Sequence, residues 1–329
     1  MTGKNQNLVH YNDQYSYDVE YKYKTNTRYQ RDLIELLEKE MSYTPKSVLD
    51  VGCGQGLNTV RFTEDWPDAK IVGVDLSDVG IEYAKSHYNS KNISFYCMDV
   101  SDLSVEGKKY DLVTAFELLE HIEDWEKIAN VMTEISNRYI MVSVPIGRMR
   151  EYEKEHGHYR NYKKGELESF FEKNGFKTVK TYYAGFPFWS PITRNLLNIL
   201  PVDNTSDVQV KMGIPKKIIS LLMYYSFKYF SFKNKGDQFV GLFEKAKWPI
   251  QELKIIYHLL TLFYNVIKCS VFHPFHLEYI IGSYLIHFDR IIKKYSQMHI
   301  MWQSKWNMKM YFSLIVQKQN IPALIPLIF

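Results

Sequence analysis

The sequence has few cysteines, and this scarcity argues against two common ways of stabilising a fold. Its three cysteines, Cys53, Cys97 and Cys269, are odd in number and widely spaced among 329 residues. That spacing matches neither a disulfide framework nor a structural zinc site. We therefore expect a protein of a reducing compartment, the cytoplasm, with no bound metal.

Long apolar runs are also missing. No stretch reaches the roughly 18 consecutive apolar residues of a membrane-spanning helix. The first residues, MTGKNQNLVHYNDQYSYD, are polar and lack the apolar core of a signal peptide. The sequence thus predicts a chain that does not cross a membrane.

Acidic residues are scarce toward the end of the chain. From Lys211 onward there are 16 Lys and Arg against 5 Asp and Glu, whereas the preceding 210 residues hold 25 against 32. The net charge of +4 is therefore the sum of an acidic N-terminal part, residues 1–210, and a basic C-terminal part. Because no basic helix or stacking motif accompanies this charge, we expect no nucleic-acid partner.

Strand-like and helix-like segments alternate in the front half of the chain. Short β-branched runs occupy 46–51, 70–75, 93–98, 110–115 and 138–144, and helical patterns occupy 57–66, 78–88 and 124–137. A further helical pattern precedes the first strand, with Leu33, Leu36, Leu37 and Met41 on one face. This order predicts a parallel sheet covered on both faces, with its βα loops and any ligand site at one edge.

The pattern changes after Pro145. A helix is expected at 163–176 with Gly175 as its C-terminal glycine, followed by strands at 177–185 and 236–246. The long segment between those strands, 186–235, is rich in Pro and aromatic residues and is expected to cover the active site.

The glycine-rich stretch VLDVGCGQG, residues 48–56, is the strongest local motif. Gly52, Gly54 and Gly56 follow a predicted strand, so a ligand can approach backbone that a Cβ would block. Asp50 precedes them at the end of the strand, where a carboxylate would repel a pyrophosphate but can accept hydrogen bonds from an ammonium group.

Two further acids end the next two strands. Asp75 lies where a carboxylate can grip both hydroxyls of a ribose. Asp99, beside Val100 and Met98, lies where it can accept from an adenine amino group while an apolar neighbour packs on the ring. Three predicted strands thus end in acids that share one edge of the sheet.

These residues resemble the motifs of the class I S-adenosylmethionine-dependent methyltransferases, particularly the small-molecule branch that includes quinone-biosynthesis O-methyltransferases. VLDVGCGQG looks like that family's first motif, VGVDLS its second, CMDVSDL its third, and AFELLEHIED the segment that closes the fourth strand. The resemblance runs from about residue 28 to 247. It implies a doubly wound α/β fold with a mostly parallel seven-stranded sheet and a late antiparallel hairpin.

The resemblance also implies which residues hold S-adenosylmethionine. Asp50 and the three glycines would surround its methionine portion, with Arg28 on the carboxylate. Asp75 and Leu76 would hold the ribose side and Asp99 and Val100 the adenine, and Glu117 lies in the motif that ends the fourth strand.

Simpler interpretations stay open for each motif. The glycines can form only a tight turn, and Asp75 and Asp99 can merely cap the turns that follow them. A nicotinamide dinucleotide is a rival ligand, but its Gly-x-Gly-x-x-Gly loop would need glycine where Leu57 stands.

Two histidines are the candidates for acceptor chemistry. If FELLEHIED is helical, Glu117, Glu120 and His121 share a face over the cofactor, and His121 is the proposed base or acceptor-orienting group. In EKEHGHYRNYKKGEL, residues 153–167, His158 and Arg160 can line the acceptor pocket together with Tyr159. The alternatives are an inert His121 paired with a neighbouring glutamate and a solvated charged loop.

The segment KKIISLLMYYSFKYFSFKNK, residues 216–235, is apolar and aromatic between lysines. It is typical of a helix on an anionic surface, of a cover over an apolar pocket, or of a helix packed on its own domain. The first interpretation predicts peripheral contact with the inner membrane face.

We divide the chain into an N-terminal segment (1–27), a methyltransferase domain (28–247) and an extension (248–329). The extension is expected to be a helical membrane-surface or partner-binding appendage, or a poorly folded tail. The predicted function is methyl transfer to a small-molecule or lipid-linked acceptor in surface-glycan or quinone-type biosynthesis. The rivals are an NAD(P)-dependent oxidoreductase and a non-catalytic S-adenosylmethionine-binding protein.

Overall fold

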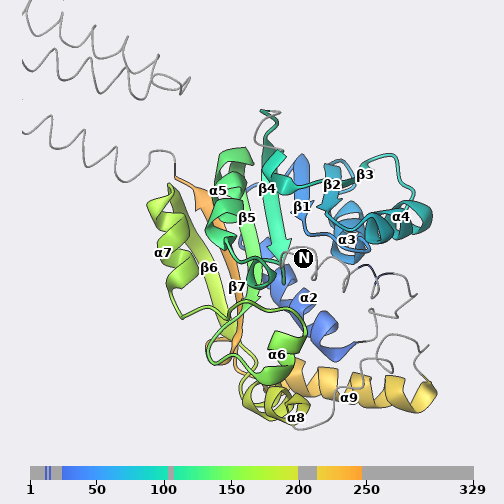
Figure 1. Ribbon diagram of the computed structural model, residues 1–329, viewed down its shortest axis with the longest axis vertical. Coiled ribbons are helices and arrows are strands. Elements are labelled where there is room, and N and C mark those ends of the chain that lie inside the picture. Colours follow the sequence, from blue (N-terminus) through green and yellow to red (C-terminus); the bar gives the residue numbers. More distant parts are fainter. Residues whose placement is uncertain (1–11, 13–14, 16–23, 103–106, 199–212, 247–329) are drawn as a thin grey trace, which may run out of the picture. The chain divides into compact units, whose positions relative to one another are not determined.

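A computed structural model of the chain describes residue 12, residue 15 and residues 24–102, 107–198 and 213–246. Within these residues a seven-stranded sheet is flanked by helices (Figure 1). Its strands are β1 (Ser47–Val51), β2 (Lys70–Asp75), β3 (Ile93–Cys97), β4 (Tyr110–Phe116), β5 (Ser136–Pro145), β6 (Phe176–Ala184) and β7 (Gln238–Lys245). Each lies where a strand was predicted.

The strand order is β3-β2-β1-β4-β5-β7-β6, and β7 runs antiparallel between β5 and β6. Strands β1 to β5 pair in parallel. The order reverses between β1 and β4, and in open α/β sheets the ligand crevice lies at such a reversal, beyond the carboxyl ends of the strands. The predicted doubly wound sheet with a late antiparallel hairpin is confirmed.

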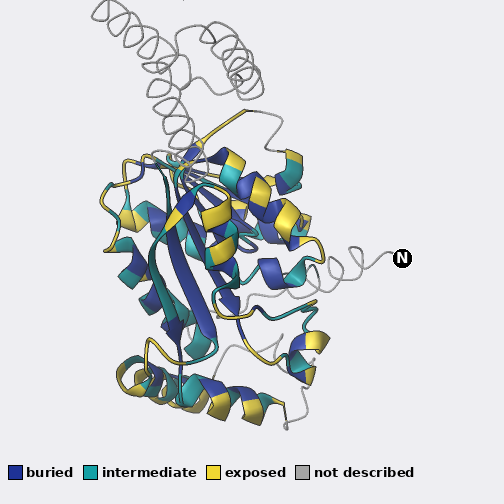
Figure 2. Cartoon of the chain, turned by 90° about the vertical axis from the view of Figure 1, so that its left-hand side faces the viewer, coloured by how far each residue is buried: buried dark blue, intermediate teal, exposed yellow. Residues whose placement is uncertain are grey.

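Helices cover both faces of the sheet. They are α2 (Thr25–Glu38), α3 (Leu57–Asp65), α4 (Asp78–His87), α5 (Trp125–Ile135), α6 (Glu151–Glu155), α7 (Glu166–Lys173), α8 (Arg194–Leu197) and α9 (Ile214–Phe230). Side chains of β1 alternate between two cores: Leu49 and Val51 pack with α5 and α7, whereas Val48 packs with α2, α3 and α4. The central strands β1, β4, β5 and β7 are accordingly buried along most of their length, whereas the edge strands β3 and β6 are more open (Figure 2).

Helix α2 shows how the local sequence produces this packing. Its buried residues Tyr29, Leu33, Ile34 and Leu37 recur at helical spacing and face the sheet. The helix ends at Glu38, so Met41, which was expected on the same face, lies beyond its end.

The late part of the domain was only partly predicted. Helix α7 ends before Gly175, whose φ of 84° is the left-handed conformation expected of a C-terminal glycine. Helix α6 was not predicted. It joins α8 and α9 at the end of the sheet toward which the carboxyl ends of the parallel strands point (Figure 1).

The chain divides into two units, Met1–Leu253 and Lys254–Phe329. The predicted extension, 248–329, lies outside the described residues, so its proposed helical character stays a prediction. Among the described helices, none combines the length and the apolar character required to cross a membrane.

Candidate functional site

The glycine loop adopts the left-handed backbone that its sequence predicts. Gly52, Gly54 and Gly56 have φ angles of 71°, 53° and 80°, values that residues with a Cβ rarely adopt. Gly56 is also the residue that precedes α3, so the loop leads directly into the N-terminus of that helix. The motif therefore forms a strand, a bare turn and a helix start, as expected.

Side chains approach the loop so closely that no Cβ fits. A Cβ on Gly52 would lie 2.6 Å from Leu118 Cδ1, and one on Gly54 would lie 2.7 Å from the Tyr15 hydroxyl oxygen. Leu118 belongs to the segment after β4, and Tyr15 belongs to the N-terminal part of the chain. The loop is thus contacted from the two sides between which a ligand at the β1–β4 reversal would enter.

Asp75 is fixed at the end of β2 by backbone donors. Its Oδ2 accepts a hydrogen bond from the Gly54 amide at 2.8 Å, and its Oδ1 accepts one from the Ser77 amide at 2.8 Å. Burial raises the pKa of this carboxyl. The next residue, Leu76, exposes 41% of its surface, so an apolar side chain stands open beside the oriented acid.

Asp50 lies inside the domain. It is 2% exposed, and its two carboxylate oxygens accept hydrogen bonds from the Thr59 hydroxyl at 2.6 Å and the Thr114 hydroxyl at 2.7 Å. Burial raises the pKa of Asp50 to about 6. Asp50 therefore ties β1 to α3 and β4, which supports the loop from behind.

Asp99 and Val100 follow β3. Asp99 Oδ1 accepts hydrogen bonds from the amide and the hydroxyl of Ser101, so this acid caps the short turn that begins at Val100. The Val100 side chain is 7% exposed and belongs to the core beside α5. Val100 and Met98 were both considered for a contact with the adenine ring. Val100 is buried in the core, whereas Met98 is only partly buried.

The segment after β4 is not one continuous helix, so the expected shared face does not form. Glu117 has a φ of 50°, and a single helical turn follows at Leu119–His121. The Glu117 carboxylate accepts hydrogen bonds from the Ser143 hydroxyl at 2.7 Å and the Gln238 amide at 2.9 Å. Glu117 thus faces β5 and β7, while Glu120 and His121 face elsewhere.

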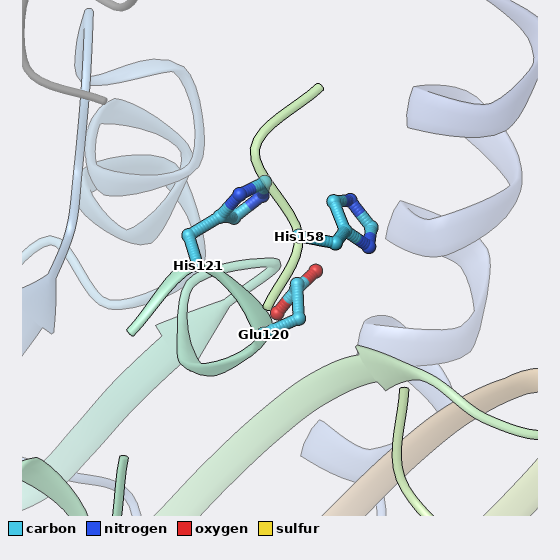
Figure 3. A group of neighbouring side chains, drawn as sticks. All are labelled: Glu120, His121 and His158. Carbon is cyan, nitrogen blue, oxygen red and sulfur yellow. The ribbon is translucent and has the colours of Figure 1, made fainter. Parts of the chain in front are cut away.

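Glu120, His121 and His158 come together as one cluster (Figure 3). A ligating atom from each lies within 4.8 Å of the other two, and the rings of His121 and His158 meet edge to face with centroids 4.5 Å apart. The Glu120 carboxylate points toward the gap between the two rings. Glu120 and His121 come from the turn after β4, and His158 comes from the loop after α6. The two segments are joined by a 2.8 Å hydrogen bond that the Tyr159 amide donates to the Glu120 carbonyl.

Within this cluster, Glu120 is unusual because it is a buried acid. Glu120 is 0% exposed, and neither carboxylate oxygen has a hydrogen-bond partner among the residues that the structure describes. Burial raises the pKa of Glu120 well above its ordinary value, and burial lowers the pKa of His158. One carboxylate and two imidazoles are a common donor set for divalent metals, so the fold assembles a candidate metal site where the sequence predicted none.

Two predicted arginines have partners inside the domain. The Arg28 guanidinium lies over the Tyr224 ring, 5.7 Å from its centroid. Arg160 forms an ion pair with Glu166 and lies over the Tyr162 ring at 4.8 Å. The loop around Arg160 is therefore structured rather than a freely solvated one.

Sequence reasoning missed a buried ionic network between α6 and the insertion. Arg194, 1% exposed, pairs with Glu153, and its Nη1 lies 3.1 Å from Asp237 Oδ2. Arg150 joins the same network through Asp237 at 3.6 Å. The paired residues are 41, 43 and 87 positions apart in the chain, so no local sequence pattern predicts the network.

The family model described as "Methyltransferase domain" matches residues 21–181. A ubiquinone biosynthesis O-methyltransferase of Coxiella burnetii is 34% identical over 29% of this chain and 41% of its own length. A malonyl-[acyl-carrier protein] O-methyltransferase of Acetivibrio thermocellus is 32% identical over 31% of this chain and 35% of its own. The chain thus spans about two fifths or less of the length of these curated relatives.

Solved structures give a weaker likeness. The magnesium protoporphyrin IX methyltransferase of Synechocystis PCC 6803, solved with bound SAH, is 19% identical with a TM-score of 0.40 over 48% of this chain and 74% of that one. A putative sarcosine dimethylglycine methyltransferase of Galdieria sulphuraria is 13% identical with a TM-score of 0.46 over 66% and 85%.

The family match covers the glycine loop, the three acids and the turn after β4, which are the elements that the fold gathers at the β1–β4 reversal. Residues 21–181 therefore match the methyltransferase-domain family, and this part of the chain is similar to the class I S-adenosylmethionine-dependent methyltransferases in motifs and sheet order.

Proposed function

We propose that this chain methylates a hydroxyl group of a small-molecule acceptor and uses S-adenosylmethionine as the donor. One observation carries the proposal: the carboxylate that ends β2 is held by an amide of the glycine loop. This contact fixes an acid and a bare backbone side by side, which is what an adenosine-containing ligand with a charged amino-acid end requires.

The donor would be held by residues of three strand ends. Asp75 and Leu76 take the ribose side, the backbone of Gly52 and Gly54 takes the amino-acid side, and Tyr15 closes over the loop. Asp50 acts as a positioning residue, because its oxygens are engaged by Thr59 and Thr114. When bound, S-adenosylmethionine supplies an electrophilic methyl group on a sulfonium centre.

Five further residues are proposed to contribute to the donor site. Asp99 and Val100 take the adenine edge, Gly56 starts the helix behind the loop, and Arg28 and Glu117 close the amino-acid end. Their present partners, among them Tyr224 and Ser143, would hold these side chains in place.

Acceptor chemistry is assigned to His121 and His158. His121 takes the proton of the acceptor hydroxyl, and His158 orients the acceptor. Burial lowers the pKa of His158, which keeps its imidazole neutral and able to accept a hydrogen bond near neutral pH. The Glu120 carboxylate is buried beside both rings, within 4.8 Å of a ring nitrogen of each.

The acceptor is proposed to be a quinone-type or surface-glycan precursor, free or lipid-linked. The names of the two curated relatives support transfer to oxygen. The aromatic insertion at 186–235 supports an apolar acceptor, because its helices lie at the end of the sheet where the parallel strands point.

Formation of S-adenosylhomocysteine in the presence of a panel of phenolic, quinol and hydroxy-sugar acceptors tests this function. A His121→Gln variant should lose at least about a hundredfold in kcat with the best acceptor, the usual scale of general-base catalysis. His87→Gln, on the exposed surface of α4, is the matched control and should leave kcat unchanged.

Two outcomes would contradict the proposal. Equal kcat for the wild type and His121→Gln would exclude His121 as the base. Donor binding without turnover on any acceptor would instead favour a non-catalytic S-adenosylmethionine-binding protein.

A further inference from the structure

Helix α9 is apolar on two opposite faces, and only one of them is used by the domain. The inner face is fastened to α2: Phe227 meets Tyr29 edge to face at 5.7 Å, and the Tyr224 hydroxyl donates to Asp32 at 2.9 Å. Ser220 on the same face hydrogen-bonds Thr25 at 3.0 Å. The helix is thus held firmly along its length.

The outer face is a continuous apolar stripe. Ile218, Leu222, Tyr225 and Tyr229 recur every three or four residues and are 53%, 62%, 44% and 67% exposed. Single exposed apolar residues are ordinary on proteins, but a stripe along about three turns of one helix indicates a binding surface. We call these four residues the α9 stripe.

The segment that carries the α9 stripe has charges of one sign, and of its lysines Lys228 is paired with Asp32 of α2 at 3.2 Å. Residues 213–236 contain five lysines, Lys216, Lys217, Lys228, Lys233 and Lys235, and no aspartate or glutamate. An apolar helix face bordered by lysines is the arrangement that lies in the interface of an anionic bilayer, with the ammonium groups at the headgroups. Tyrosines suit the same depth, because the ring is apolar and the hydroxyl is polar.

This charge also argues against the two other occupants that the chain itself offers. A two-fold contact between copies would bring the same lysine-bearing segment against itself without an acidic partner. The C-terminal residues 247–329 are basic as well, with nine Lys and Arg against three Asp and Glu. Neither a second copy of α9 nor residues 247–329 would bring an excess of negative charge to the lysines of this segment.

We propose that the outer face of α9 docks the protein on an anionic lipid bilayer. The inner face of α9 packs on α2, which contacts Gln238 through Gln30 at 3.5 Å, and Gln238 in turn contacts Glu117. Docking stands on the α9 stripe alone. That a lipid-linked acceptor reaches the site from this membrane rests on the proposed function.

Flotation of the full chain with vesicles tests the proposal. Vesicles of phosphatidylcholine mixed with phosphatidylglycerol should carry the protein, whereas phosphatidylcholine alone should carry little, and added salt should weaken binding. The double variant Ile218→Glu/Leu222→Glu should bind the mixed vesicles at least about tenfold more weakly. Tyr96→Glu, an equally exposed apolar position on β3 (52%), is the matched control and should bind like the wild type.

A second variant guards against misfolding of the first. Lys216→Glu/Lys233→Glu changes only exposed side chains and should also weaken binding about tenfold, with Lys85→Glu on α4 as its control. S-adenosylmethionine binding, measured on every variant, should stay at the wild-type level. Failure of docking and failure of the proposed function are therefore seen separately.

Three results would overturn the proposal. If the wild-type protein does not bind anionic vesicles, α9 is not a docking surface. The same conclusion follows if both double variants bind these vesicles as well as the wild type does. A wild-type dimer that Ile218→Glu/Leu222→Glu converts to a monomer, without vesicle binding, would identify the α9 stripe as a contact between copies.

Discussion

The Asp75 carboxylate accepts a hydrogen bond from the amide of Gly54 at 2.8 Å, across 21 residues of sequence. This contact joins the ends of β1 and β2, so the bare turn and the acid keep a fixed relation. A ligand that needs both meets a preorganised site, which reduces the ordering cost of binding.

Gly54→Ala should abolish most donor binding. A Cβ at this position would lie 2.7 Å from the Tyr15 hydroxyl oxygen, and its φ of 53° is strained for alanine. Gly165→Ala is the matched control, because Gly165 also has a positive φ, 81°, but nothing lies within 4 Å of an added Cβ. Both variants should lose about 1 kcal/mol of unfolding free energy in urea titrations. Only Gly54→Ala should weaken S-adenosylmethionine binding, and equal loss in both would contradict the role of the loop.

Asp50→Asn should change how stability depends on pH. The folded state raises the pKa of Asp50 to about 6 from 3.8, so the fold binds this proton more tightly than the unfolded chain does. The contribution of Asp50 to stability is therefore fully present below the unfolded value and is lost as the pH rises through about 6.

Relative to Asp50→Asn, the wild type should lose about 1 kcal/mol of unfolding free energy between about pH 5 and about pH 7.5. Urea unfolding at the two pH values measures the difference. A gap between the two proteins that stays constant with pH would show that Asp50 has an ordinary pKa.

Glu120→Gln separates a metal site from a buried neutral acid. If Glu120, His121 and His158 bind a divalent ion, the wild type should retain zinc or manganese after dialysis and lose turnover with EDTA. Glu120→Gln should then retain no metal. Elemental analysis and kcat before and after chelation provide the two measurements.

Absence of bound metal together with EDTA-resistant turnover would assign Glu120 a purely structural role. In that case Glu120→Gln should unfold at the same urea concentration as the wild type or higher, because burial already disfavours the charged form of Glu120.

Arg194→Ala should be among the most destabilising changes in the domain. It would leave Glu153, 2% exposed, without its buried partner, which typically costs about 3–5 kcal/mol. Arg138→Ala is the control, since Arg138 pairs with Glu244 at the surface and such pairs contribute about 1 kcal/mol or less. A loss of similar size in both variants, measured by urea unfolding, would contradict the buried network.

The sheet and the glycine loop could be predicted because their signals are local. Each of the first three β-branched runs is followed within a few residues by its own signal, the glycines 52, 54 and 56 after the first run and Asp75 and Asp99 at the ends of the next two. The inward position of Asp50 follows from the same logic, because strand alternation places it on the face that Val48 shares with α3. That deduction was not drawn from the sequence, where Asp50 was assigned to the ligand.

The acceptor side could not be predicted to the same extent, because its contacts are distant in sequence. His158 reaches Glu120 across 38 residues, and Arg194 reaches Glu153 across 41. The expected shared face of Glu117 and His121 failed because Glu117 adopts a positive φ and interrupts the turn. Of the three interpretations that the sequence of α9 allowed, the structure shows the helix packed on its own domain, while the membrane-surface interpretation stays a prediction.

Isothermal titration with S-adenosylmethionine tests the central claim most directly. The wild type and Glu82→Ala, an exposed acid on α4, should bind the donor equally, while Asp75→Ala should bind at least about tenfold more weakly. Equal binding by all three proteins would place the donor elsewhere. Folded wild-type protein that binds NADH, or no nucleotide at all, would contradict the assignment of the site.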